Sequence, residues 1–164
     1  MIIAVIIIAI STGSEYMKKP MILVTSAREA LRYVMSHFCQ PGVTEYPENT
    51  DIYAAISIQD TIGGGFCFEL KENQYCKGVL TLYFDDIEKP EHGFKLIDKY
   101  QAEQIIEFIN MHRDVDTLLI HCFAGISRSK AVGMFAREML EIQSTKETYY
   151  NHYVYETLKK NWAV

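Results

Sequence analysis

Short apolar runs alternate with amphipathic segments along most of this chain. Runs of mostly aliphatic residues with the length of buried strands lie at 21–24, 52–58, 78–84 and 117–120. Segments with apolar residues at helical spacing lie at 27–38, at 101–109, from 129 onward and from 149 onward. Because strands alternate with helices, the pattern predicts an α/β fold with a mainly parallel central sheet and helices on its faces.

The first two helices have recognisable boundaries and faces. Ser26 and Glu29 have the spacing of a capping box, which predicts a helix start. Its apolar positions are expected to lie in the core: Ala27, Ala30, Leu31, Val34, Met35 and Phe38. In the second helix the expected apolar face holds Ala102, Ile105, Ile106 and Ile109, with Gln101, Glu103 and Gln104 off it. The tyrosines from 149 onward are assigned to packing rather than to stacking on a substrate.

The 164 residues, with hydrophobic residues at 49% and charged residues at 23%, fit a single domain with one core. The formal charge of −5 and the lack of a basic stripe argue against a nucleic-acid partner.

Residues 1–10 are almost wholly aliphatic, but the run is too short to span a bilayer and no basic residue precedes it. A poor secretory signal, an extra strand, a membrane-associating tail and an upstream extension are the alternatives. We favour a hydrophobic extension or accessory element over 1–20, before a domain at 21–164.

The remaining composition points to a cytoplasmic protein without a cofactor. Cys39, Cys67, Cys76 and Cys122 are widely spaced and form no repeated motif, which fits a reducing compartment. For the first three we favour a packing role or chance occurrence over a resolving role toward Cys122. The five histidines show no paired ligand spacing, so no metal site is predicted. The glycines at 63–65 lack a following Lys-Ser/Thr and are expected to form a flexible turn.

The strongest chemical signal is the stretch 121–129, which reads His-Cys-Phe-Ala-Gly-Ile-Ser-Arg-Ser. Because a strand precedes this loop and a helix follows it, loop amides and the positive end of the helix dipole converge on one point, where an anion fits. A thiolate at Cys122 is favoured there, and Arg128 presents a planar fork of donors that matches two phosphate oxygens. Gly125 permits the tight turn, and Ser129 is close enough to donate a hydrogen bond to the sulfur.

A proton donor that faces this loop would assist the departure of an alkoxide or phenoxide from phosphate. Asp85 and Asp86 follow the strand at 78–84 and open a polar loop that contains Pro90. Since carboxyl ends of parallel strands lie along one edge of a sheet, we expect these carboxylates on the same edge as Cys122.

The pattern His-Cys-x5-Arg-Ser, with Ala-Gly-Ile-Ser inside it, resembles the phosphate-binding loop of the cysteine-dependent protein tyrosine phosphatases, particularly the dual-specificity branch. The resemblance covers residue 21 to the final helix and implies a three-layer catalytic domain. It implies that Cys122 is the nucleophile and Arg128 the phosphate-binding residue, while Ser129 supports the thiolate and His121 orients the loop. It also implies that the phosphate is bound by the amides of Phe123, Ala124, Gly125, Ile126, Ser127 and Arg128. When Leu82 and Phe84 are placed on the two inward strand positions of the family, Asp86 becomes the general acid, with Asp85 as the alternative.

This resemblance implies a metal-independent phosphomonoester hydrolase that acts through a phosphocysteine on a phosphorylated protein or a small phosphoester. The chain is too short for the full domain of the tyrosine-specific enzymes, and its loop lacks the lysines of phosphoinositide-selective relatives. The alternative is a pseudophosphatase module that docks a phosphorylated partner, although the intact Cys122, Arg128 and Ser129 count against it. Sulfur transfer or arsenate reduction is less favoured, because small arsenate reductases carry this loop near the N-terminus.

Overall fold

A computed structural model describes residues 18–39, 42–43, 45–66, 68–143 and 147–162. Within these ranges four strands form one sheet in the order β1-β4-β2-β3, and every neighbouring pair is parallel. The strands are β1 (Met21–Ser26), β2 (Tyr53–Gln59), β3 (Cys76–Tyr83) and β4 (Thr117–Cys122). The predicted α/β fold with a mainly parallel central sheet is confirmed.

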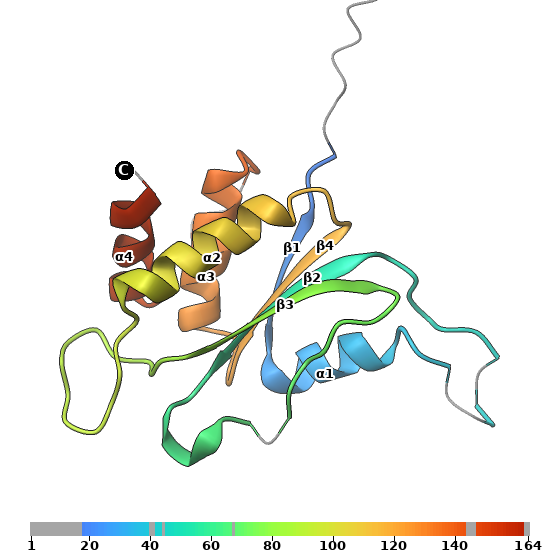
Figure 1. The fold of residues 1–164 in the computed structure, drawn as a ribbon, viewed down its shortest axis with the longest axis horizontal. Helices are drawn as coiled ribbons and strands as arrows, with labels where there is room; N and C mark the ends of the chain where they lie inside the picture. Colours follow the sequence, from blue (N-terminus) through green and yellow to red (C-terminus); the bar gives the residue numbers. More distant parts are fainter. Residues whose placement is uncertain (1–17, 40–41, 44, 67, 144–146, 163–164) are drawn as a thin grey trace, which may run out of the picture.

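Helices cover both faces of this sheet, which makes three layers (Figure 1). Helix α1 (Ala27–Met35) lies on one face, while α2 (Lys99–Met111) and α3 (Arg128–Met139) lie on the other. Helix α4 (His152–Trp162) packs against α2 and α3. A single 3-10 turn (Ile62–Gly64) follows β2, where the sequence predicts a glycine turn.

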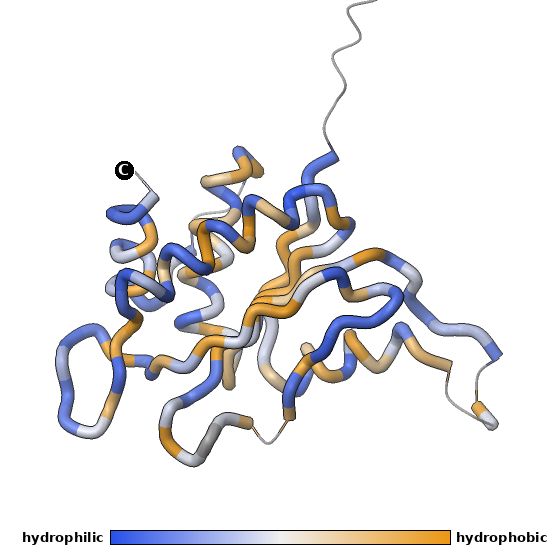
Figure 2. The backbone as a smooth tube through the Cα atoms, viewed as in Figure 1, coloured by the Kyte–Doolittle hydropathy of each residue, from blue (hydrophilic) through white to orange (hydrophobic). Residues whose placement is uncertain are grey.

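Strand β2 shows why the apolar runs of the sequence are continuous and do not alternate with polar residues. All seven of its residues are buried, because helices cover the sheet on both faces. Ala54, Ile56 and Ile58 face the large core beneath α2 and α3, whereas Tyr53 and Ala55 belong to the smaller core on the α1 side. Figure 2 shows the resulting concentration of hydrophobic residues along the central strands.

Helix α1 begins at the predicted capping box, in which Ser26 and Glu29 bond each other's backbone amides. The expectation that all its apolar positions lie in the core is wrong. Leu31, Met35 and Phe38 are 41%, 49% and 40% exposed. The physical reason is that α1 meets the sheet through a narrow stripe around the buried Ala27 and Ala30, and these three side chains lie off that stripe.

Two other helix boundaries depart from the sequence pattern. Gln101 was expected off the apolar face of α2, but it is buried, because it completes a capping box with Asp98 and donates its side-chain amide to Tyr83 O at 2.9 Å. The sequence pattern predicts a final helix from residue 149, but α4 begins at His152. Asn151 precedes it as a capping residue and accepts a hydrogen bond from Val154 N at 2.9 Å.

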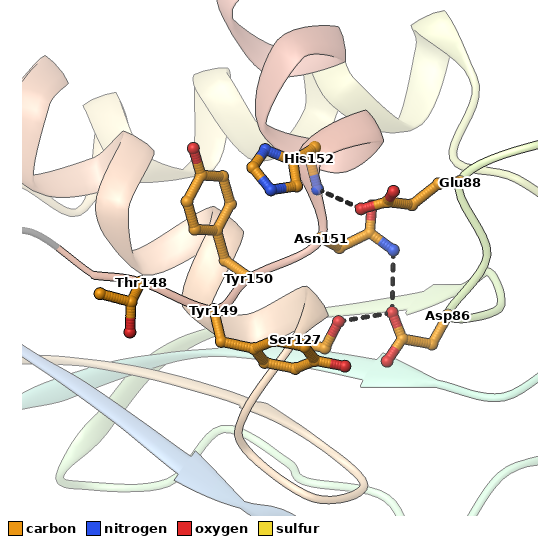
Figure 3. Close-up of a pocket in the computed structure, with 8 residues that line it drawn as sticks. All are labelled: Asp86, Glu88, Ser127, Thr148, Tyr149, Tyr150, Asn151 and His152. Carbon is orange, nitrogen blue, oxygen red and sulfur yellow. Dashed lines mark hydrogen bonds between the residues drawn. The ribbon is translucent and has the colours of Figure 1, made fainter.

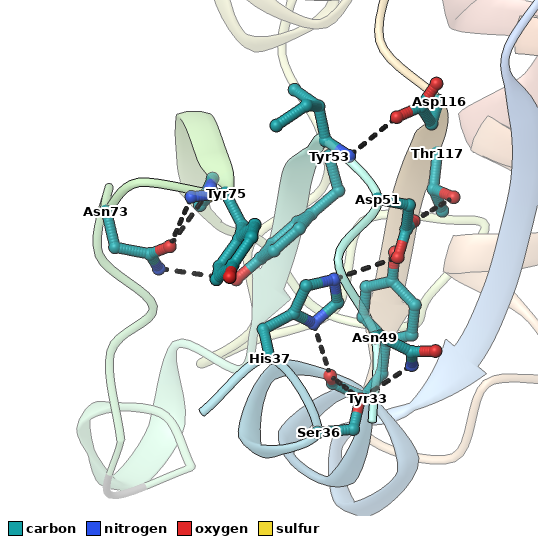
Figure 4. Close-up of polar contacts among 12 residues, drawn as sticks. Tyr33, Ser36, His37, Asn49, Asp51, Tyr53, Asn73, Tyr75, Asp116 and Thr117 are labelled. Atoms are coloured by element: carbon teal, nitrogen blue, oxygen red, sulfur yellow. Dashed lines mark hydrogen bonds and ion pairs between the residues drawn. The ribbon is translucent and has the colours of Figure 1, made fainter. Parts of the chain in front are cut away.

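A polar network ties α1 to the amino ends of β2 and β4 (Figure 4). Asp51 accepts hydrogen bonds from Thr117 Oγ1 at 2.7 Å and from the Tyr33 hydroxyl, and it pairs with His37 Nε2 at 2.9 Å. His37 is only 1% exposed. Because Thr117 begins β4 and Cys122 ends it, this network lies at the opposite edge of the sheet from the cysteine and fastens the layers together.

The expected N-terminal element at 1–20 lies outside the described residues except for positions 18–20. Lys18 pairs with Asp116 just before β4, and Lys19 Nζ donates to Glu141 O at 2.7 Å. None of the helices in the described ranges is long and apolar enough to cross a membrane.

Candidate active site

The cysteine loop joins β4 directly to α3. Cys122 is the last residue of β4 and is 2% exposed, and its Sγ lies 3.1 Å from Ser129 Oγ in the first turn of α3. The amide of Gly125 donates a second hydrogen bond to Sγ at 3.3 Å. The sulfur therefore lies between a hydroxyl and a backbone amide at the start of α3.

Gly125 makes the tight turn of this loop possible. Its φ of +76° lies in the left-handed region that side-chain-bearing residues rarely adopt. A Cβ at this position would lie 2.5 Å from the backbone of both Thr25 and Ser26 at the end of β1. Ala27 N also donates to Phe123 O at 3.0 Å, so the loop is packed and bonded against the junction of β1 and α1.

The guanidinium of Arg128 is buried and oriented by two acceptors. Nη1 donates to Phe84 O at 2.7 Å, and Nη2 pairs with the carboxylate of Asp60 at 2.7 Å. The side chain is 4% exposed. Nε is buried and has no hydrogen-bond partner within the part of the chain that the structure describes. An anion in the loop would supply the acceptor that this donor lacks.

Asp60 is a residue that the sequence analysis missed. It follows the last residue of β2, so it lies at the same carboxyl edge of the sheet as Cys122. A carboxylate directly after a fully buried strand is a signal that could have found it, since such edges collect binding residues in parallel sheets.

The two neighbouring aspartates after β3 have different surroundings. Asp85 is 5% exposed and accepts hydrogen bonds from Thr61 N at 3.0 Å, from Lys95 N at 2.8 Å and from the Thr61 hydroxyl. Burial by itself raises the pKa of a carboxyl, but these hydrogen bonds and the charge of Arg128 outweigh it and lower the pKa of Asp85 below its ordinary value. Asp85 therefore stays a carboxylate that holds two loops together.

Asp86 is exposed and faces the cysteine loop. Its Oδ1 accepts hydrogen bonds from Ser127 Oγ at 2.7 Å and from Asn151 Nδ2 at 2.8 Å (Figure 3). Ser127 belongs to the cysteine loop, and Asn151 caps α4. The structure thus brings Asp86 to the loop that carries Cys122, as the sequence predicts for this edge of the sheet.

A pocket of about 290 Å³ lies between Asp86 and the segment that leads into α4 (Figure 3). Its lining residues are Asp86, Glu88, Ser127, Thr148, Tyr149, Tyr150, Asn151 and His152. The packing role expected for the tyrosines holds for Tyr150, whose ring lies 5.6 Å from that of Tyr155. It is wrong for Tyr149, which is 63% exposed at the pocket, because the chain here is not yet helical.

His121 lies behind the loop in an aromatic environment. It is fully buried, its ring stacks on Phe68 with centroids 5.9 Å apart, and Nδ1 lies 3.4 Å from Cys122 O. Desolvation by burial lowers the pKa of His121 to about 4, although the contact with the Cys122 carbonyl acts in the opposite direction. The ring is therefore neutral near pH 7 and supports the loop by packing.

The depressed pKa of His121 makes the fold sensitive to acid. Between pH 6.5 and about pH 4, His121 binds a proton in the unfolded chain but stays neutral in the folded chain. The free energy of unfolding therefore decreases as the pH is lowered through this range. The full loss from this residue is roughly 3 kcal/mol. We expect His121→Gln to flatten the difference in urea-unfolding free energy between pH 7 and pH 4. An unchanged pH slope in this variant would contradict the assignment.

The other two described cysteines lie away from Cys122. Cys76 opens β3 and is level with the first residue of β4, because both pair with Tyr53. Five residues of strand therefore separate it from the level of Cys122, about 16 Å. Cys39 is exposed in the segment after α1. Cys67 lies outside the described residues.

The described ranges contain no group of three or more His, Cys, Asp or Glu side chains that could hold a metal ion. Comparison of the sequence with protein-family models and with curated proteins finds no match.

Proposed function

We propose that this protein is a phosphomonoester hydrolase that uses Cys122 as its nucleophile, in the manner of the dual-specificity phosphatases that its loop resembles. The observation that carries the proposal is the surroundings of one sulfur atom. Cys122 Sγ is bonded by Ser129 Oγ and Gly125 N at the start of α3, and next to it the buried Arg128 holds an unpartnered Nε within the described residues. A nucleophile and a cationic fork at one helix N-terminus suit attack on a bound phosphate.

In the first step Cys122 attacks phosphorus, so that a P–S bond forms while the ester P–O bond breaks. The electron pair of the broken bond goes to the leaving oxygen, which takes a proton from Asp86. Arg128 donates to a phosphate oxygen through Nε and stabilises the charge that the phosphoryl group carries in the transition state. In the second step water attacks phosphorus, Asp86 takes a proton from this water, and Cys122 leaves as a thiolate that Ser129 stabilises.

The surroundings of the two aspartates support Asp86 rather than Asp85 as the general acid. Asp85 is buried and its oxygens accept three hydrogen bonds, so its carboxylate stays charged and has no access to a leaving group. Asp86 is exposed beside the loop, where an ester oxygen can approach it.

Three exposed apolar or aromatic side chains near the loop support a phosphorylated protein or a small phosphoester as the substrate class. Phe123, Ile126 and Tyr149 are 65%, 52% and 63% exposed at the loop and at the neighbouring pocket.

The reaction requires a reduced thiol, and the described cysteines are free, so we place the protein in the cytoplasm.

Hydrolysis of p-nitrophenyl phosphate in the presence of EDTA tests the proposal. We expect metal-independent turnover by the intact chain, with a phosphocysteine trapped by rapid acid quench. Asp86→Asn should lower kcat by about 10²-fold, because general acid catalysis contributes about 10²–10⁴ in rate. Asp85→Asn should act mainly on stability. Phosphate binding by a folded, reduced protein without turnover would overturn the proposal in favour of a docking module.

A further inference from the structure

Asn151 joins the start of α4 to the loop that carries the general acid. It is 2% exposed, and its two side-chain functions serve different elements; Figure 3 shows its amide bonded to Asp86. The carbonyl Oδ1 accepts the hydrogen bond from Val154 N at 2.9 Å and caps the helix. The amide Nδ2 donates to Asp86 Oδ1 at 2.8 Å and to Ile87 O at 3.3 Å. A side chain that both accepts and donates is needed here, and asparagine supplies both functions.

Two further contacts strengthen the same junction. Glu88 Oε1 accepts a hydrogen bond from His152 N at 2.7 Å, at the free amides of the α4 N-terminus. Asn151 N lies 3.4 Å from Ser127 O and so connects α4 to the cysteine loop as well. Residues 86–88 are therefore fastened to α4 through both side chains and backbone.

Both donors to the Asp86 carboxylate reach the same oxygen. Ser127 Oγ and Asn151 Nδ2 lie 2.7 and 2.8 Å from Oδ1. Oδ2 accepts no hydrogen bond within the described residues, so it is the oxygen that is available to a leaving group. The orientation of the carboxylate then decides where Oδ2 and its proton point.

We propose that Asn151 is a positioning residue for the general acid, which holds the Asp86 carboxylate against Ser127 so that its free oxygen faces the leaving group. This inference rests on the proposed hydrolase function and deepens it. Among its hydrogen bonds to described residues none reaches Cys122, so Asn151 acts through Asp86.

Variants at position 151 and two esters test this role. Asn151→Asp keeps the shape and the acceptor for Val154 N, but it sets a second carboxylate against Asp86. Asn151→Ser keeps a capping hydroxyl and is too short to reach Asp86. We expect kcat/KM, which reports the step that breaks the ester P–O bond, to fall by at least about tenfold in both variants on phenyl phosphate, whose phenoxide is a poor leaving group. On 2,4-dinitrophenyl phosphate, whose leaving group needs little protonation, the fall should stay below about threefold.

Asn161→Asp is the matched control, because it places the same change on the same helix, where Asn161 donates to Thr157 O at 2.7 Å. It should leave both rates unchanged. An equal loss on both esters at position 151 would show a purely structural role and overturn the inference, as would no loss on either. If the intact chain hydrolyses neither ester, the proposed function itself fails; turnover by the intact chain together with an equal response to the two esters rejects only the role of Asn151.

Discussion

Replacing Cys122 by serine is expected to abolish the hydrolysis of p-nitrophenyl phosphate, with kcat falling by at least about 10⁴-fold. The serine oxygen fits the same space, but it holds its proton far more tightly than sulfur does. The groups that bond the sulfur, Ser129 Oγ and Gly125 N, stabilise an anion without removing a proton from a hydroxyl. The nucleophile is therefore lost while the loop is kept.

Phosphate binding separates this loss from misfolding. Cys122→Ser should still be stabilised against thermal unfolding by inorganic phosphate, because Arg128 and the loop remain. Cys39→Ser changes an exposed cysteine and should keep full activity. Residual turnover within tenfold of the wild type in the Cys122 variant would exclude this cysteine as the nucleophile.

The substitution Arg128→Lys is expected to lower kcat/KM by about 10²–10³-fold, the effect of losing one preorganised transition-state donor. Arginine reaches Phe84 O and Asp60 from its two terminal nitrogens, and its Nε has no hydrogen-bond partner in the described part of the chain, where we propose that the phosphate binds. A lysine has one ammonium group on a flexible stem and cannot bond to Phe84 O, Asp60 and the phosphate at once. If it turns toward Asp60, the phosphate loses its partner.

Arg137→Lys is the matched control for this change. Arg137 lies on the same helix, and its Nη2 donates to Ile22 O at 3.0 Å on β1. Both variants lose a backbone contact, so both should lower the unfolding temperature slightly, and only Arg128→Lys should lower kcat/KM. Similar kinetics in the two variants would remove Arg128 from the reaction.

Local order in the sequence accounts for much of what could be predicted. The apolar runs specify buried strands, and their alternation with helical segments leads to a parallel sheet whose carboxyl ends share an edge. Cys122, Gly125, Arg128 and Ser129 lie within eight consecutive positions between a strand and a helix. Their proximity therefore follows from chain connectivity, and the sequence alone places them around one point.

Contacts between distant segments were decided only in the tertiary structure. Asp60 meets Arg128 and Asn151 meets Asp86 across 65 residues or more, at strand and helix ends where hydrophobic periodicity no longer reports the direction of a side chain. The opposite surroundings of Asp85 and Asp86 depend on Thr61, Lys95 and Ser127, which belong to three other segments. The exposed Leu31 and Met35 have the same origin, because the packing of α1 on the sheet determines which side of an amphipathic helix is covered. A sequence specifies which side chains are available near an edge of a sheet, but only the packing of the elements sets their directions.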